Sequence, residues 1–207
     1  CLAQIIRDEY KDSELTGLAQ QIIEQTDRTS KILESLVNFA HAGTNKLMHE
    51  NERVLLSECI AQAQTLVSLD KKNKDMQLEI DCDPEAAILG DSQRLLQVLI
   101  NLINNARDAS QEGGTIVLAA KNMGTHINIS VTDFGIGIPN AIKSRVFDPF
   151  FTTKEAGEGT GLGLSLVFSI VEDLNGNIDI ISPVDRARGT GTQVLLKFPC
   201  YDPFSQG

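Results

Sequence analysis

The sequence has few of the features that mark membrane-spanning, nucleic-acid-binding or zinc proteins. It contains no tryptophan, and no apolar run approaches the roughly 20 residues of a membrane-spanning helix. Its 18 Lys and Arg residues stand against 28 Asp and Glu residues, and this net charge of −10 argues against nucleic-acid binding. The four cysteines form no C-x-x-C pair, which disfavours a zinc site or a redox motif. We therefore expect a globular cytoplasmic protein with reduced thiols.

The sequence also lacks an initial methionine and a signal peptide. It begins at Cys1 within a helical pattern, CLAQIIRDEY, which is typical of the end of a helix, and KDSELTG then predicts a turn. From this beginning we expect a fragment of a longer protein.

A heptad series follows this turn, with alternating steps of three and four residues, and such a series forms a packing seam for another helix. Its members are Leu15, Leu18, Ile22, Gln25, Thr29, Ile32, Leu36 and Phe39. We expect residues 1–42 to be part of an antiparallel helical hairpin that dimerises into a four-helix bundle. The alternative is a helix that packs on the following domain of the same chain.

A polar connector, HAGTNKLMHENE, places a domain boundary near residues 42–50. Beyond it, the sequence predicts helices at about 57–70, 92–109 and 162–174, and strands at about 76–81, 86–89, 115–121, 126–132, 177–182 and 192–198. Neighbouring strands without an intervening helix favour an antiparallel or mixed sheet with helices on one face, which is an α+β fold.

The predicted helix at 92–109 carries a single polar stripe on an otherwise apolar surface. The stripe consists of Gln97, Asn101, Asn104, Asn105 and Asp108. A solvated stripe usually carries Lys and Glu, whereas this one is mostly amides, whose oxygens suit Mg²⁺. The stripe is therefore either a solvated face or a surface that binds a ligand.

Asp133 ends the predicted strand HINISVTD and has the parity of its apolar residues, so its carboxylate should point toward the core. A buried carboxylate needs hydrogen-bond donors, and an adenine amino group would supply one. Gly135 and Gly137 would let the backbone bend closely around such a ligand. The alternative is a β-turn in which the aspartate caps its own backbone.

The stretch GEGTGLGLS leads from a glycine-rich loop into a helix, where exposed amides can cradle a phosphate. Gly159, Gly161 and Gly163 would form that cradle, or else a flexible structural loop. Its pattern is neither a P-loop nor a dinucleotide fingerprint. The preceding segment, NAIKSRVFDPFFTTKEAGE, predicts a lid or disorder, and its aromatic residues favour a lid.

These four stretches, in this order, resemble the motifs of sensor histidine kinases. NLINNARDA looks like the N box, DFGIGIP the first glycine box, FDPFF the F box and GTGLGLS the second glycine box. FFTTK and NARDA are most similar to the nitrogen-regulation branch, and GTGTQVLLKFP matches the last strand of the family. The resemblance implies a Bergerat-type ATP-binding α/β sandwich over residues 50–200.

The resemblance also implies roles for individual residues. Asn105 would hold Mg²⁺ against the triphosphate, with Asn101 beside it. Asp133 would receive the adenine amino group with help from Thr192, and Gly135 and Gly137 would border the base. The phosphates would be lined by Gly159, Thr160, Gly161, Leu162 and Gly163, and Lys154 would be the lid cation for the γ-phosphate. Asp108 and Ala109 stand where many family members carry a basic or aromatic residue.

Gyrases and other ATPases of the same fold activate water with a glutamate four residues before the Mg²⁺-binding asparagine. This chain has Asn101 there, and an amide cannot act as that base, so phosphoryl transfer is favoured over hydrolysis. None of His41, His49 and His126 fits the family's acceptor pattern, so we expect the phosphoacceptor histidine upstream of Cys1.

The resemblance thus predicts a cytoplasmic catalytic region, or the cytoplasmic part of a membrane-anchored sensor. It would bind ATP and Mg²⁺, dimerise through its helical hairpin, and pass phosphoryl groups to a histidine and then to a response-regulator receiver domain. The alternatives are a protein serine kinase of the anti-sigma-factor type and a non-catalytic ATP-sensing module.

Overall fold

The structure is a computed structural model, which describes residue 4 and residues 13–44, 52–69, 76–155 and 159–200. The helix predicted at residues 1–10 therefore lies outside the described residues except for Gln4, as does most of the polar connector. In the described ranges, no helix has both the length and the apolar character that a membrane crossing requires.

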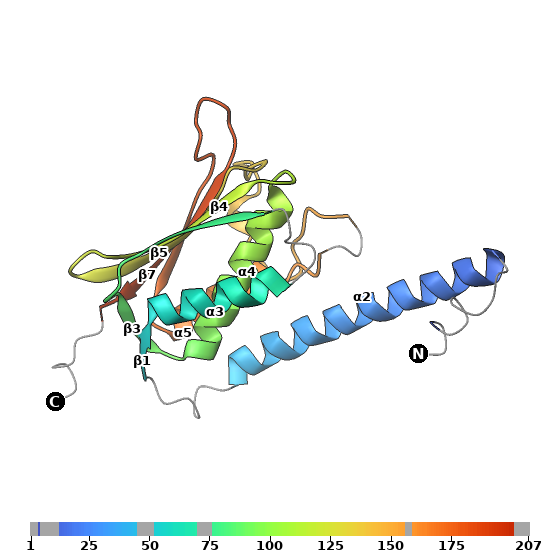
Figure 1. The fold of residues 1–207 in the computed structure, drawn as a ribbon, viewed down its shortest axis with the longest axis horizontal. Coiled ribbons are helices and arrows are strands. Elements are labelled where there is room, and N and C mark those ends of the chain that lie inside the picture. The colour runs from blue at the N-terminus through green and yellow to red at the C-terminus, as the bar shows by residue number, and fades with distance from the viewer. Residues whose placement is uncertain (1–3, 5–12, 45–51, 70–75, 156–158, 201–207) are drawn as a thin grey trace.

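A long helix, α2 (Ser13–Thr44), precedes the sheet and contacts α5 (Gly163–Asp173), while its N-terminal half extends away from the other elements (Figure 1). The turn predicted from KDSELTG is wrong from Ser13 onward, because these residues begin α2. Gly17 disfavours a helix, but the neighbouring Glu, Leu and Ala residues are strong helix formers and outweigh it. Although α2 contacts the following domain, three heptad positions, Leu15, Leu18 and Ile22, remain 45–57% exposed.

A five-stranded mixed sheet forms the centre of the remaining chain. Its strands, in spatial order, are β2 (Gln77–Cys82), β4 (Thr115–Asn122), β5 (His126–Asp133), β7 (Thr192–Pro199) and β6 (Asn177–Ile181). The first two strands are parallel and all other neighbours are antiparallel. The mixed sheet predicted from the sequence is confirmed.

A second, two-stranded sheet pairs β1 (Glu52–Leu55) with β3 (Ala87–Gly90) in antiparallel register. The strand predicted at 86–89 thus exists but does not join the main sheet. The strand β1 was not predicted from the sequence, because its four residues follow a polar connector and show no clear alternation.

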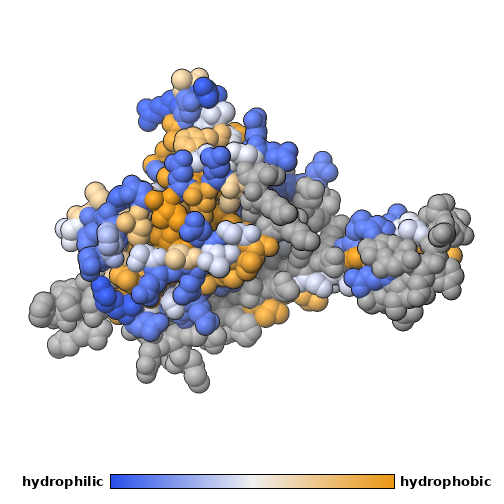
Figure 2. All heavy atoms as spheres, viewed as in Figure 1, coloured by the Kyte–Doolittle hydropathy of each residue, from blue (hydrophilic) through white to orange (hydrophobic). Residues whose placement is uncertain are grey.

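Three helices cover one face of the main sheet: α3 (Leu56–Leu69), α4 (Ser92–Ala109) and α5 (Figure 1). Alternate residues of the three central strands face these helices and are almost fully buried. They are Ile116, Leu118, Ala120, Ile127, Ile129, Val131, Leu196 and Phe198. Figure 2 shows hydrophobic residues in the middle of this part of the molecule, ringed by hydrophilic ones. The predicted α+β sandwich with helices on one face is confirmed.

Candidate functional site

Two members of the polar stripe of α4, Asn101 and Asn105, face the beginning of α5. The helix buries Leu95, Leu99 and four more apolar residues against the core, which turns the stripe toward its neighbour. A Cβ atom placed on Gly163 would lie 3.2 Å from Asn101 Oδ1 and 3.8 Å from Asn105 Nδ2. The fold therefore brings together the two predicted ligand amides and the last glycine of the predicted phosphate loop.

The hydrogen bonding of the Asn101 and Asn105 side chains leaves their amide oxygens available to bind a ligand. Asn101 Nδ2 donates to the Gln97 carbonyl oxygen at 2.9 Å, while the Asn105 side chain forms no hydrogen bond with any described residue. Asn104 is different, because its Oδ1 accepts from Arg107 at 3.1 Å. Neutral oxygens without a protein donor are the ligands that Mg²⁺ accepts in small number beside phosphate and water. Asn101 and Asn105 thus fit a magnesium ion, and Asn104 does not.

The start of α5 has the features of an anion site. No side chain caps the first turn at Leu162, so its backbone N–H groups are available to a ligand. By contrast, the N-terminus of α4 is capped by Asp91, which accepts from Gln93 N and Arg94 N at 2.8 and 3.2 Å. The absence of a cap at α5 leaves a place for phosphate.

The glycine loop lies directly against the FFTTK segment. Gly161 has a φ of +67°, and a Cβ there would come within 2.3 Å of the Phe150 carbonyl carbon. A Cβ on Gly159 would lie 2.6 Å from Thr152 Oγ1, and the Thr160 hydroxyl accepts weakly from Leu162 N at 3.4 Å. Side chains at these glycines would separate the two segments.

Residues 140–155, which contain the F box, form a folded segment. Phe147 packs on Phe168 of α5 with 5.4 Å between ring centroids, and the Arg145 guanidinium lies 4.7 Å from the centre of the Phe151 ring. A short 3₁₀ helix, η2 (Lys143–Arg145), begins the segment. For these residues the structure favours the lid over disorder.

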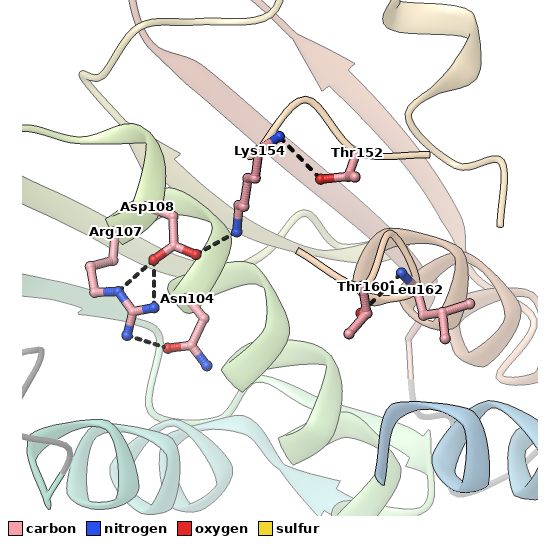
Figure 3. Close-up of polar contacts among 7 residues, drawn as sticks. All are labelled: Asn104, Arg107, Asp108, Thr152, Lys154, Thr160 and Leu162. Atoms are coloured by element: carbon pink, nitrogen blue, oxygen red, sulfur yellow. Dashed lines mark hydrogen bonds and ion pairs between the residues drawn. The ribbon is translucent and has the colours of Figure 1, made fainter. Parts of the chain in front are cut away.

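Lys154, the predicted phosphate cation, pairs with Asp108 at the end of α4 (Figure 3). Asp108 Oδ1 also accepts from Arg107 Nε at 2.8 Å, and Arg107 reaches back to Asn104. Burial alone would raise the pKa of Asp108, but the hydrogen bonds from Lys154 and Arg107 outweigh burial and lower it. The sequence left Asp108 without a role, and the structure makes it the ion-pair partner of Lys154.

The other end of the site is built around Asp133, which is 5% exposed. Its Oδ1 accepts from Gly135 N at 2.9 Å, and its carboxylate also receives the backbone N–H of Thr192. Burial raises the pKa of Asp133, and these two bonds only partly oppose that rise. The prediction that this carboxylate points toward the core is confirmed.

The backbone that follows Asp133 is fastened to the end of α4. Ile136 N donates to the Ala109 carbonyl oxygen at 3.0 Å, and a Cβ on Gly135 would lie 2.0 Å from that same oxygen. Gly137 has a φ of +74°, which explains the second glycine of DFGIG. One helix, α4, thus touches both the loop after Asp133 and the loop before α5.

Ser182, which the sequence did not single out, is 5% exposed and lies just after β6. Its Oγ accepts from Ile138 N at 2.7 Å and donates to the Gly191 carbonyl oxygen at 2.9 Å. No pattern pointed to this serine, because its partners come from segments far apart in the sequence.

Comparison with known proteins identifies the family of this chain. Residues 90–202 match the family described as histidine kinase-, DNA gyrase B- and HSP90-like ATPase. Over 183 residues the chain is 36% identical to the sensor histidine kinase ZraS of Escherichia coli K12, a match that covers 88% of this chain and 37% of ZraS. The chain spans between 27% and 40% of the length of ZraS and the other sequence relatives that rank with it.

Solved structures agree as well. The catalytic domain of histidine kinase ThkA matches with a TM-score of 0.64 and 31% identity, covering 73% of this chain and 97% of that domain. ThkA in complex with the response regulator TrrA matches with a TM-score of 0.70 and 25% identity, covering 97% of this chain and 56% of that one. This chain therefore belongs to the histidine kinase-, DNA gyrase B- and HSP90-like ATPase family, and its ATP-binding domain is homologous to those of sensor histidine kinases.

Proposed function

We propose that this chain is the catalytic region of a sensor histidine kinase, which binds Mg·ATP and transfers the γ-phosphoryl group to a histidine of the full-length protein. One observation carries the proposal. A single helix, α4, presents Asn101 and Asn105 to the uncapped start of α5, while its last carbonyl is bonded to the loop that follows Asp133. That arrangement suits a ligand with phosphates at one end and a base at the other.

At the base end, an ionised Asp133 can only accept hydrogen bonds. Two backbone N–H groups already reach this buried carboxylate, and the exocyclic amino group of adenine would add a third donor. Thr192 is its register partner on β7, so both side chains begin on neighbouring backbone positions. Gly135 and Gly137 would border the base because they allow the backbone to pass close to it.

At the phosphate end, Asn105 would hold Mg²⁺ and Asn101 would lie beside it, since the side-chain amides of both residues lie next to Gly163 of the glycine loop. Bound Mg²⁺ neutralises charge on the triphosphate and on the phosphoryl group in transfer. The N–H groups from Gly159 to Gly163 would orient the phosphate oxygens for in-line attack.

Lys154 would then contact the γ-phosphate. Its ammonium group is ion-paired with Asp108, so it would have to exchange a carboxylate for a phosphate oxygen. Both partners are about one-third exposed, and a pair of that exposure is worth little, so a multiply charged phosphate can compete for the lysine. Asp108 would hold the lysine near the phosphate loop until that exchange.

The described side chains that α4 presents to the phosphate loop, Asn101 and Asn105, are amides rather than strong bases, and Asn101 Nδ2 donates to the Gln97 carbonyl oxygen. Water would therefore not be activated there, and the phosphoryl group would pass to a positioned protein nucleophile. We propose that the acceptor is none of His41, His49 and His126. The ThkA–TrrA complex supports a response-regulator receiver domain as the next partner.

The exposed heptad positions of α2 support a homodimer formed through this helix and its hairpin partner. In such a dimer, each catalytic domain would lie near the acceptor helix of its own subunit and near that of the other subunit.

Titration of the purified chain with labelled ATP and Mg²⁺ tests this function. We expect wild-type binding, loss of binding by at least about a hundredfold in Asn105→Asp and Asp133→Asn, and little release of ADP. Asn104→Asp is the matched control, because Asn104 is bonded to Arg107 and should tolerate the change with ATP affinity intact. Rapid conversion of ATP to ADP by the wild type would contradict the proposed role of Asn101.

A further inference from the structure

Ser182 joins three separate segments around the predicted base site. Its Oγ accepts from Ile138 N at 2.7 Å, donates to the Gly191 carbonyl oxygen at 2.9 Å, and lies 3.3 Å from Thr192 Oγ1. A Cβ placed on Gly137 would lie 3.2 Å from the same oxygen. The Ser182 hydroxyl therefore contacts Ile138, Gly191 and Thr192 at the same time.

The direction of each of these hydrogen bonds follows from counting protons. A serine hydroxyl has one proton and two lone pairs. The Gly191 carbonyl oxygen can only accept, so it takes the proton of Ser182, and Ile138 N–H can only donate, so it uses one lone pair. The contact with Thr192 is then a hydrogen bond only if Thr192 donates its own single proton to the second lone pair of Ser182.

This assignment changes what Thr192 can offer to a ligand. With its proton given to Ser182, the Thr192 hydroxyl has only lone pairs left and can only accept. Asp133, its register partner across β5 and β7, is likewise an acceptor when ionised. The two side chains therefore present acceptors alone at the base end of the site.

We propose that Ser182 is a positioning residue that determines nucleobase selectivity, because it holds the Thr192 hydroxyl as an acceptor and so favours 6-aminopurines over 6-oxopurines. The proposal rests on the proposed ATP-binding function. A 6-amino group brings two N–H donors to two acceptors, directly or through a water molecule. A 6-oxo group would place a third acceptor there, and a buried pair of acceptors without a proton between them is unfavourable.

The dissociation constants of ATP and inosine triphosphate, measured with Mg²⁺ on the purified chain, test this inference. We expect the wild type to bind ATP at least about tenfold more tightly than inosine triphosphate. Ser182→Ala releases the proton of Thr192, which can then turn toward a 6-oxo group. The preference for ATP should therefore fall about tenfold, the usual size of one hydrogen bond in a selectivity ratio.

A second pair of variants separates selectivity from general loosening. Thr192→Val removes the hydroxyl itself, so it should also lower the preference, and adding Ser182→Ala to it should change the preference no further. Ser165→Ala is the matched control, because it removes another buried serine hydroxyl, one that donates to the Leu162 carbonyl oxygen near the phosphate loop. That variant should change both affinities by the same factor.

Two results would overturn the inference: equal weakening of both nucleotides by Ser182→Ala, or an unchanged preference in Thr192→Val. If circular dichroism shows that Ser182→Ala does not fold, the nucleotide preference of Thr192→Val tests the inference instead. A wild type that binds neither nucleotide would instead overturn the proposed ATP-binding function. A wild type that prefers ATP, with a preference that Ser182→Ala leaves unchanged, would overturn only the role of Ser182.

Discussion

Asp133 illustrates, at the scale of one residue, a conflict between binding and stability. Burial raises its pKa above the usual value, so the folded protein disfavours the ionised form that an amino group needs. Because the folded-state pKa lies above the unfolded one, the charge costs folding free energy at neutral pH. That cost disappears as the pH falls through the raised pKa.

We therefore predict that Asp133→Asn, which we expect to weaken nucleotide binding, raises the melting temperature of the free protein at pH 7 by about 2 °C. The asparagine oxygen still accepts a backbone N–H bond but carries no charge. Melting curves at pH 7 and at lower pH measure the effect, and the gain should shrink as the wild-type carboxylate becomes protonated. A variant that melts below the wild type at pH 7 would show that the backbone bonds to the charge outweigh its burial.

Single residues differ in how far the sequence can predict them. Asp133 was predictable, because strand parity alone indicates on which face its carboxylate lies. That Asn101 and Asn105 share one face of a helix was predictable from the helical period, whereas the period alone did not say whether that face meets solvent or a ligand. Ser182 was not, since a lone serine in a polar stretch becomes informative only when its partners on other segments are known.

At the scale of elements, an ion pair fastens the start of α4 to the end of α5. Arg94 Nη2 lies 2.6 Å from Asp173 Oδ2, and both side chains are only 16–17% exposed. The pair fixes the two helices whose other parts bring Asn101 next to Gly163. Its loss would leave a largely buried charge without this partner.

We predict that Arg94→Ala lowers the free energy of unfolding by about 2 kcal/mol. Lys197→Ala is the control, because Lys197 pairs with Asp179 at 2.9 Å between β7 and β6 but both side chains are 41–58% exposed. Its cost should stay below about 0.5 kcal/mol. Urea unfolding of the two variants measures the difference, and equal costs would contradict a stabilising role for the α4–α5 pair.

Most elements could be predicted from their periodicity, and the failures have physical causes. The strand β1 is four residues long, and pairing with β3 rather than its own pattern makes it a strand. Lys11 and Asp12 of the turn predicted at KDSELTG lie outside the described residues, and from Ser13 onward the prediction was wrong. One glycine does not stop a helix that strong helix formers continue.

At the scale of the whole molecule, α2 carries apolar residues that the described chain does not cover. Leu18 and Ile22, at heptad positions, are 53% and 57% exposed. A second copy of the chain would bury them in the predicted bundle.

We predict that the purified chain is a dimer by size exclusion with light scattering, and that Leu18→Glu with Ile22→Glu makes it a monomer. ATP affinity should stay within about twofold, because these side chains lie on α2, outside the proposed nucleotide site. Leu69→Glu, which changes a 75% exposed leucine at the end of α3, is the control and should leave the dimer intact. A monomeric wild type would rule out dimerisation through α2 alone.

The bond between Ile136 N and the Ala109 carbonyl oxygen limits how the molecule can open. The helix α4 carries Asn101 and Asn105 of the proposed phosphate end, and its last carbonyl is bonded to the loop of the proposed base end, so this bond couples the two ends. We therefore expect release of a spent nucleotide to depend on movement of the segment from Lys143 to Glu155. Substitutions in that segment such as Phe147→Ala, which removes the contact with Phe168, should then alter turnover more than they alter recognition of the base.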